Sequence, residues 1–321
     1  MDRRAFIGSL AGGLLAAPLA AEAQPAGKVY RIGATVGSDI NYAAFLQGLR
    51  EAGWVPGQNA VVERRSAQGE RAGVAAMVSE IVALKVDVIL ATAPWTIRTF
   101  RNATSTIPIV GLDLESDPVS NGFVASLARP GGNLTGVFLD LPEIGGKQLQ
   151  LLKETVPGLA RVCVLWEPEV GEPQLRATEG AARLAGLTLN AVGIRRGGEL
   201  AAALDRAAGG RAQAMVVLTS PLISNNLRQI AELAQKYRLP TISPFTSFPS
   251  AGALMAYGPS QPEMFRLAAT YVDRILRGAR AGELPIERPS RFELVINPKT
   301  AKALGLTIPA SLLQRADQVI E

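Results

Sequence analysis

The chain has 321 residues, of which 48% are hydrophobic and 19% charged, and its formal net charge is +5. This composition is typical of a soluble globular protein, and the length is enough for two domains. With no histidine and a single cysteine, Cys163, the chain excludes Ser-His-Asp and Cys-His catalysis, an intrachain disulfide and a cysteine-based zinc site. Its basic residues are scattered, so nucleic acid is not expected as a partner.

The N-terminal segment, residues 1–23, has the pattern of an export signal. An arginine pair at positions 3 and 4 precedes an apolar stretch over residues 5–17, and Ala-Glu-Ala at 21–23 resembles a cleavage site. The stretch is shorter than the about 20 residues that span a bilayer. We expect cleavage after Ala23, by the general secretory route or by the twin-arginine route, whose signal the arginine pair resembles. The sequence therefore predicts a periplasmic protein.

From residue 30 onward, short apolar runs alternate with amphipathic helical patterns. In the first half, strands are expected at residues 30–35, 60–64, 86–90, 107–112 and 134–139. Helical spacing of apolar residues separates the first strand from the second and the second from the third. This alternation predicts a first domain built on a parallel sheet.

The alternation starts again after a helical stretch at residues 147–155. Further strands are expected at residues 161–166, 188–194, 214–218 and 240–243, with helices at 173–184, 199–208 and 225–237. Cys163 lies inside the first of these apolar runs and is expected to be a buried, inert thiol. The second set of elements predicts a second parallel-sheet domain.

The last third of the chain has too few elements for a core of its own. It contains expected strands at residues 253–257 and 292–296, a long amphipathic helix over 265–276, and a short helix from residue 301. We expect these elements to pack on the two earlier lobes, so that the chain crosses between lobes near residues 139–142, 245–250 and 281–286. Three crossings make a hinge with a cleft. The expected lobes are residues 24–140 with about 247–282, and residues 141–246 with about 283–321.

The segments after the strands form the candidate site, because ligands bind beyond the carboxyl ends of strands in open parallel sheets. The candidate residues are Ser38, Asp39, Tyr42, Thr92, Trp95, Thr96, Asp113 and Glu115 in the first lobe, and Trp166, Thr219, Ser220, Phe245 and Tyr257 in the second. These hydroxyls, carboxylates and aromatic rings suit a small polar or amphipathic molecule. A carboxylate such as Asp113 or Glu115 can hold an ammonium group, and a helix start can hold a carboxylate. We expect the Trp95 ring to stack on the ligand or to form a wall beside it, and to be partly exposed without ligand.

Catalytic chemistry has little support in the sequence. There is no P-loop and no G-x-S-x-G elbow. The carboxylates of Asp113, Glu115 and Asp117 are compatible with the paired acids of a glycosidase or with an oxygen-ligand metal site, for which their spacing is a weak signal. We therefore expect no catalytic residue, no metal and no cofactor.

Several long, non-periodic segments resemble one known family over essentially the whole chain after the signal. They are residues 45–54 (FLQGLREAGW), 104–110 (TSTIPIV), 117–119 (DPV), 124–136 around LARPGGN, 256–259 (AYGP), 292–297 (FELVIN) and 299–306 (KTAKALGL). They are similar to solute-binding components of bacterial ABC transport systems, whose relatives include tryptophan- and other aromatic amino-acid-binding proteins. In that family the loop after the third strand commonly reads Thr-Gly-Thr-Pro, whereas here it reads Thr92-Ala93-Pro94-Trp95, without the second hydroxyl.

The resemblance implies a two-lobed periplasmic binding fold of type I-like architecture, α/β in class, that closes on a small solute. It implies as partners a membrane permease with a cytoplasmic ATPase, with no other membrane contact, and we expect a monomer. Three functions remain open. The leading one is a receptor for ABC import of a small amphipathic, amino-acid-like solute. The others are an exported sensor for a membrane kinase, and an exported enzyme that uses acids such as Asp113 and Glu115.

Overall fold

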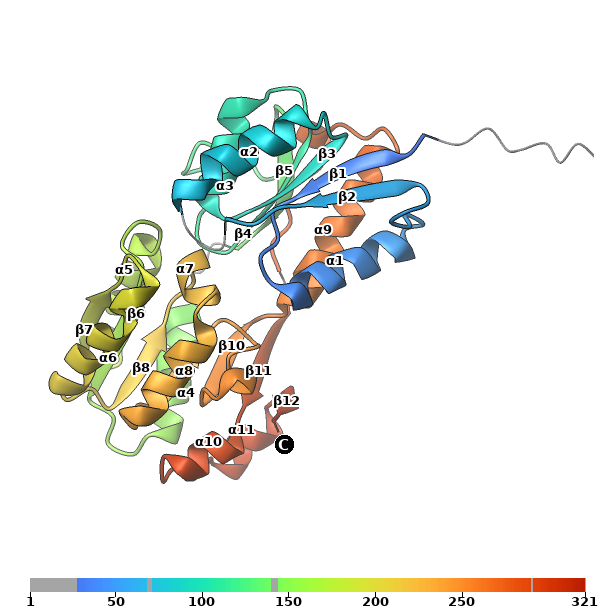
Figure 1. Ribbon diagram of the computed structural model, residues 1–321. Helices are drawn as coiled ribbons and strands as arrows, with labels where there is room; N and C mark the ends of the chain where they lie inside the picture. Colours follow the sequence, from blue (N-terminus) through green and yellow to red (C-terminus); the bar gives the residue numbers. More distant parts are fainter. Residues whose placement is uncertain (1–27, 68–70, 140–143, 290, 321) are drawn as a thin grey trace, which may run out of the picture.

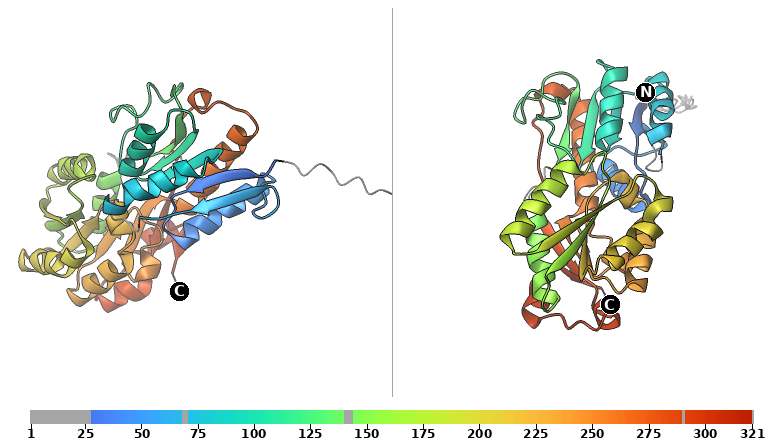
Figure 2. Two further views of the ribbon diagram at one scale, coloured as in Figure 1. Left: turned by 45° about the horizontal axis from the view of Figure 1, so that its top comes forward. Right: turned by 90° about the vertical axis from the view of Figure 1, so that its left-hand side faces the viewer.

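Two lobes, each a β-sheet flanked by helices, make up the computed structural model (Figure 1). The structure describes residues 28–67, 71–139, 144–289 and 291–320. The predicted signal peptide and its cleavage site lie outside these ranges. Figure 2 shows from two further sides that the sheets occupy separate halves of the molecule. In the described ranges, no helix combines the length and the apolar character needed to cross a membrane.

The first lobe is built on a parallel five-stranded sheet in the order β2-β1-β3-β4-β5. Its strands are β1 (Tyr30–Ala34), β2 (Ala60–Arg64), β3 (Val88–Thr92), β4 (Ile109–Asp113) and β5 (Leu134–Phe138). Helices α1 (Asp39–Glu51) and α9 (Gln261–Leu276) cover one face of the sheet, and α2 (Val74–Ala83) and α3 (Pro94–Ala103) cover the other (Figure 1). The short 3-10 helix η1 (Arg71–Gly73) leads into α2. Cover on both faces explains why β3, β4 and β5 read as continuous apolar runs.

The second lobe has a seven-stranded sheet in the order β12-β11-β10-β9-β8-β6-β7. Its strands are β6 (Arg161–Trp166), β7 (Thr188–Gly193), β8 (Ala214–Val217), β9 (Thr241–Ser243), β10 (Met255–Pro259), β11 (Phe292–Ile296) and β12 (Gln318–Val319). Its helices are α4 (Ile144–Thr155), α5 (Glu172–Leu184), α6 (Leu200–Gly209), α7 (Pro221–Ser224), α8 (Leu227–Lys236), α10 (Pro298–Ala303) and α11 (Ala310–Gln314). The strand pairs are parallel except β10 with β11. The predicted α/β fold of two parallel-sheet lobes flanked by helices is confirmed.

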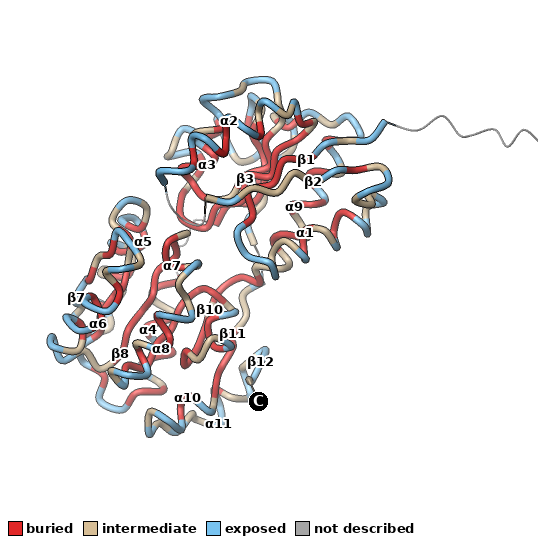
Figure 3. Tube along the Cα trace, viewed as in Figure 1, coloured by how far each residue is buried: buried red, intermediate tan, exposed pale blue. Residues whose placement is uncertain are grey.

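The cores lie where the helices meet the sheets, and buried residues concentrate in the central strands (Figure 3). Helices α1 and α9 approach closely at Gly48, where an added Cβ would lie 2.8 Å from the Cβ of Ala269 and 3.1 Å from the backbone of Arg266. Beyond the end of α1, the Trp54 indole donates to the Asp273 carboxylate at 2.9 Å. In the second lobe Cys163 is buried in β6, and burial raises the pKa of its thiol to about 12, which agrees with the predicted inert thiol.

The first predicted crossing, near residues 139–142, falls mostly on residues outside the described ranges. The other two predicted crossings are wrong. The chain does not cross near 245–250, because β10 pairs with β9 in the second sheet. It crosses at Ser260, between β10 and α9. It then stays with the first lobe past 281–286, since Glu287 bridges Val137 of β5. Residues 255–259 therefore belong to the second sheet, not to the first lobe as expected. Apolar patterning identifies a strand but does not identify the sheet in which it pairs.

Candidate functional site

A cavity of about 160 Å³ lies between the two lobes and is lined by residues of both. The first lobe contributes the segment after β1, the start of α3 and the segment after β4. The second lobe contributes α7 and the segment after β9, and the first turn of α9 lies at the crossing point. The walls mix hydroxyl and amide groups with apolar and aromatic side chains. The cavity thus lies at the carboxyl ends of the strands, where the sequence places its candidate residues.

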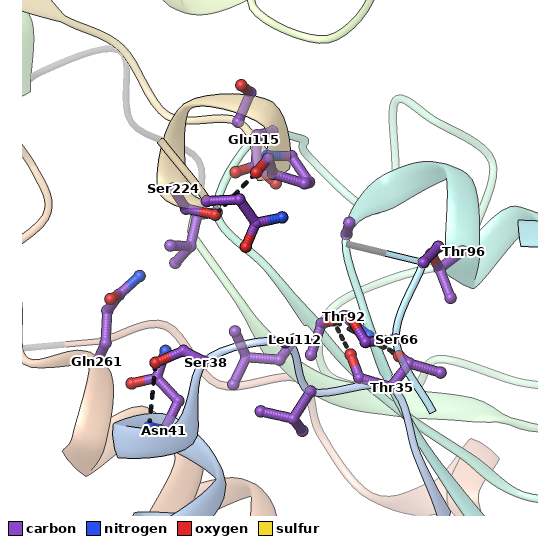
Figure 4. A pocket seen from close by; sticks show the side chains of 18 of the residues that line it. Thr35, Ser38, Asn41, Ser66, Thr92, Thr96, Leu112, Glu115, Ser224 and Gln261 are labelled. Carbon is purple, nitrogen blue, oxygen red and sulfur yellow. Dashed lines mark hydrogen bonds between the residues drawn. The ribbon is translucent and has the colours of Figure 1, made fainter. Parts of the chain in front are cut away.

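The wall after β1 is held in place by Arg64 from the neighbouring strand β2. Its guanidinium donates to the carbonyl oxygens of Val36 at 2.8 Å and Gly37 at 2.7 Å. Ser38, the next residue, caps α1 by accepting from the Asn41 backbone N–H at 3.4 Å. This clamp fixes the loop whose backbone and Ser38 hydroxyl face the cavity (Figure 4).

Helix α3 begins at the cavity after a strained residue. Ala93 has φ 76° and ψ 146°, a conformation that favours glycine, and Pro94 follows as the first helical residue. The first N–H groups of a helix have no intrahelical acceptor, and among the described residues no side chain caps α3. The amides of Trp95 and Thr96 in this first turn therefore suit an anionic group in the cavity. These residues were expected to form a loop, but a proline at the first helical position is a signal for the start of a helix.

One buried carboxyl group lines the cavity, and further buried acids lie behind its walls. Glu115, after β4, is 8% exposed and lines the cavity. Beneath it, fully buried Asp113 accepts from the Glu115 backbone N–H at 2.8 Å and from the Ser116 hydroxyl. Glu167, after β6 in the second lobe, is 4% exposed. Burial, followed by the negative charges of Asp113 and Glu167, raises the pKa of Glu115 well above its ordinary value.

The second lobe supplies a hydroxyl-rich wall around α7. Ser220 caps this helix by accepting from the Ile223 N–H at 3.0 Å, and the Ser224 hydroxyl donates to the Pro221 carbonyl at 3.0 Å. Phe245, after β9, is 2% exposed and forms an apolar part of the same wall. Figure 4 shows Glu115 of the first lobe and Ser224 of the second among the side chains around the cavity.

Trp95 lines this cavity and also a second one of about 300 Å³. Its ring is 8% exposed, which is more buried than expected. The ring packs in the first-lobe core with side chains of α2 and α3. The Arg71 guanidinium lies 5.3 Å from the ring centroid and pairs with Glu169 of the second lobe. The ion pair therefore joins the two lobes over the tryptophan.

The structure brings seven of the predicted site residues to the cavity and leaves six away from its walls. Those at the cavity are Ser38, Thr92, Trp95, Thr96, Glu115, Ser220 and Phe245. Those away from it are Asp39, Tyr42, Asp113, Trp166, Thr219 and Tyr257. Asp113 still acts on the site through Glu115, as its hydrogen bond shows.

Local contacts explain why the other five lie elsewhere. Asp39 and Tyr42 both engage Arg64, by an ion pair at 2.8 Å and by a guanidinium 4.4 Å above the ring. The Thr219 hydroxyl is turned into the lobe, where it donates to Gln174 at 2.9 Å. Tyr257 stacks on Phe292 at 5.9 Å between ring centroids, and Trp166 packs at the edge of the second core.

Several residues that line the cavity were not predicted from the sequence. The polar ones are Thr35, Asn41, Ser66, Ser224, Asn225, Ser247 and Gln261, and the apolar ones include Met77, Leu112, Leu114, Leu227 and Phe265. Asn41 and Gln261 lie in the first turns of α1 and α9. Attention to first helical turns as well as strand ends would have identified them. Across the described ranges, no group of three or more Asp, Glu, Cys or His side chains is arranged to hold a metal ion.

Proteins with a similar sequence and a similar fold are known. The tyrosine-binding protein of Clostridioides difficile (strain R20291) is 27% identical over 266 residues, which are 82% of this chain and 75% of the relative. A conserved domain protein from Vibrio cholerae has a TM-score of 0.85 at 26% identity, covering 91% of this chain and 100% of that chain. An ABC domain in complex with L-Trp from Streptococcus pneumoniae has a TM-score of 0.83 at 25% identity, covering 91% and 99%.

The family match extends over nearly all of the described chain. The family described as ABC transporter substrate binding protein matches residues 35–320, which include every strand after β1 and every wall of the cavity. The two-lobed fold and the cavity between the lobes agree with this match. The chain belongs to the ABC transporter substrate-binding protein family.

Proposed function

We propose that this protein is a periplasmic receptor that binds a small amphipathic, amino-acid-like solute between its lobes and delivers it to an ABC importer. A cavity with walls from both lobes can enclose a ligand when the lobes approach each other. The partners are a permease with a cytoplasmic ATPase, and the protein reaches the membrane by docking on the permease. Family membership supports this role.

The observation that carries the ligand class is the pairing of unlike groups in one cavity. The first turn of α3 offers N–H groups to a carboxylate. Of the described residues that line the cavity, Glu115 alone has an acidic or basic side chain, and it suits an ammonium group. Trp95 and Phe245 offer apolar surface to a side chain. The named ligands of the relatives, tyrosine and L-Trp, support the same class.

The ligand test is identification of the solute that co-purifies with the exported protein. Mass spectrometry of gently denatured protein should find an amino acid or a close analogue. Calorimetric titration with the twenty standard amino acids should then show saturable binding for at least one of them. Binding of sugars without any binding of amino acids would contradict the proposal.

The transport role needs a separate test in cells. A deletion strain should lose uptake of the labelled solute, and restoring the gene should recover it. Unchanged uptake together with a lost transcriptional response to the solute would instead favour the sensor of a membrane kinase. Turnover of the bound solute by the purified protein would favour the enzyme. Sequencing of the exported protein should find residue 24 at its N-terminus.

A further inference from the structure

The second cavity, of about 300 Å³, also has walls from both lobes. The first lobe contributes η1, α3 and the segment after β4, and the second lobe contributes the segment after β6 and the start of α5. Trp95 and Glu115 line this cavity as well as the first one. The two cavities are therefore neighbours that share two lining residues.

Helix α3 runs along both cavities. Its first turn, with Trp95 and Thr96, lines the first cavity, and Trp95, Arg98 and Thr99 line the second. Residues three and four positions apart lie on one face of a helix, and three residues add about 4.5 Å along its axis. A ligand that is held at the start of α3 and extends along this face therefore reaches Arg98 about one turn later.

Most charged side chains of the second cavity are neutralised by partners. The Arg71 guanidinium pairs with the Glu169 carboxylate, and both residues line the cavity. The Glu172 carboxylate, at the start of α5, pairs with Arg176 one turn further along the same helix. These two pairs leave no net charge that would attract a ligand.

The other two charged residues of this cavity, Arg98 and Glu115, form no ion pair within the described ranges. Arg98 donates to the Asn121 side chain at 3.3 Å and lies over the Phe123 ring at 5.0 Å. Both contacts hold the guanidinium in place without neutralising its charge, and they leave N–H donors unused. The two cavities together thus offer a guanidinium to an anionic group and, where they share a wall, a carboxyl group to a cation.

The first cavity alone is small for a solute-binding site. Its volume of about 160 Å³ lies below the about 300–1,000 Å³ that small-molecule sites commonly have. The second cavity brings the combined volume into that range. Size and charge together favour a solute that is longer than a single amino acid and carries its negative group at the far end.

We propose that the two cavities form one site that takes a dipeptide. The N-terminal ammonium lies at Glu115, and the first side chain lies beside Phe245 in the first cavity. The peptide carbonyl, which derives from the carboxylate of the free amino acid, keeps an oxygen at the start of α3. The second residue fills the second cavity, and its terminal carboxylate binds the Arg98 guanidinium. This inference rests on the proposed function, because it uses the same ammonium and α3 contacts.

The test is calorimetric titration with three compounds: the standard amino acid that binds most tightly, the dipeptide in which it precedes glycine, and the C-terminal amide of that dipeptide. If no amino acid binds, the series is built on L-tryptophan, and dipeptide binding alone still supports the inference. The dipeptide should bind at least as tightly as the amino acid. The amide lacks the terminal charge and should bind about fivefold more weakly than the dipeptide. Added salt should reduce this difference, because Arg98 is exposed.

Arg98→Gln should weaken binding of the dipeptide about fivefold and leave binding of the amide and of the free amino acid unchanged. Arg101→Gln, also exposed on α3 but lining neither cavity, is the matched control and should change none of the three affinities. Amino-acid binding without dipeptide binding, equal affinity for dipeptide and amide, or an unchanged dipeptide affinity in Arg98→Gln overturns this inference and leaves the proposed function standing. If none of the three compounds binds, the proposed function fails and this inference fails with it.

Discussion

At the scale of single residues, Ala93 is the position where site geometry and backbone preference conflict. Its φ of 76° and ψ of 146° cost an alanine about 1–3 kcal/mol, whereas a glycine adopts them freely. Ala93→Gly should therefore raise the free energy of unfolding by about 1 kcal/mol, after the about 0.5–1 kcal/mol that glycine loses in chain entropy. Urea denaturation measures this. Ala91→Gly, in buried strand β3 without a positive φ, is the control and should destabilise the protein. Equal losses in both variants would contradict the argument.

Substitution of Trp95 tests whether this residue of the cavity wall contributes to ligand binding. Trp95→Ala should weaken amino-acid binding about tenfold or more, because stacking and apolar contact are lost. The ring is almost fully buried, so the same change should also lower the free energy of unfolding by about 3–5 kcal/mol. Trp95→Phe keeps most of the packing and separates the two effects. Calorimetry on the phenylalanine variant should still show weaker binding with little loss of stability; unchanged affinity would assign Trp95 a structural role only.

At the scale of secondary-structure elements, the contact of α1 with α9 depends on Gly48. A methyl group there would meet Ala269 and the backbone of Arg266, so Gly48→Ala should destabilise the fold by about 1–3 kcal/mol. At Gly180, within α5, an added Cβ would meet only the end of the Arg183 side chain, at an ordinary contact distance of 3.9 Å. Gly180→Ala should therefore stabilise by about 0.5–1 kcal/mol through helix propensity. Thermal unfolding of the two variants should shift in opposite directions, and a shared direction would show that Gly48 does not limit the helix contact.

The ion pair of η1 with the segment after β6 joins the lobes. Both side chains are substantially exposed, at 54% for Arg71 and 37% for Glu169, so the pair contributes about 1 kcal/mol or less. Arg71→Gln should weaken ligand binding by about fivefold at most, and added salt should remove the difference. Arg176→Gln breaks a pair inside α5 and should leave affinity unchanged. A large loss that persists in high salt would mean that Arg71 contacts the ligand directly.

The sequence predicts the positions of strands and helices better than it predicts which of them pair or pack together. Strands β2, β6 and β11 match their predicted bounds, because each contains an apolar run next to polar residues, although most of β2 is only partly buried. Helix α3 was missed because its β-branched and aromatic residues disguise helical spacing. Strand β10 was given to the wrong lobe, because pairing depends on the path of the chain. At the site, Thr92, Glu115 and Ser220 were predicted correctly because they lie at or just after strand ends. Asp39 and Tyr42 were not, because they lie on helix α1 and contact Arg64 instead of the cavity.

At the scale of the whole molecule, the buried acids make stability depend on pH. The pKa of Glu115 is raised well above 4.5 in the folded protein, so between those values the folded chain holds a proton that the unfolded chain has lost. Its contribution is therefore fully present below the ordinary pKa and is lost as pH rises through the raised value. Asp113 and Glu167, with pKa values also raised by burial, act in the same direction.

Ligand-free protein should accordingly show a fall in free energy of unfolding between about pH 5 and about pH 8. Glu115→Gln should reduce this fall and should be more stable than wild type at the higher pH. Urea titrations at both pH values measure the two differences, with Glu172→Gln as the control for loss of one acidic side chain. A fall of the same size in Glu115→Gln would place the titrating group elsewhere.

The packing of α9 on the first sheet also sets an order of assembly during synthesis. Residues 30–138 supply the five strands of that lobe, but the helix that covers one face of them comes from Gln261–Leu276. Until the ribosome has added that helix, buried side chains of α1 such as Phe45 and Leu49 lack part of their core. Contacts between segments so far apart in the chain form slowly, and the waiting surface is prone to aggregation. The lobe that is made first is therefore finished only after most of the second lobe has been synthesised.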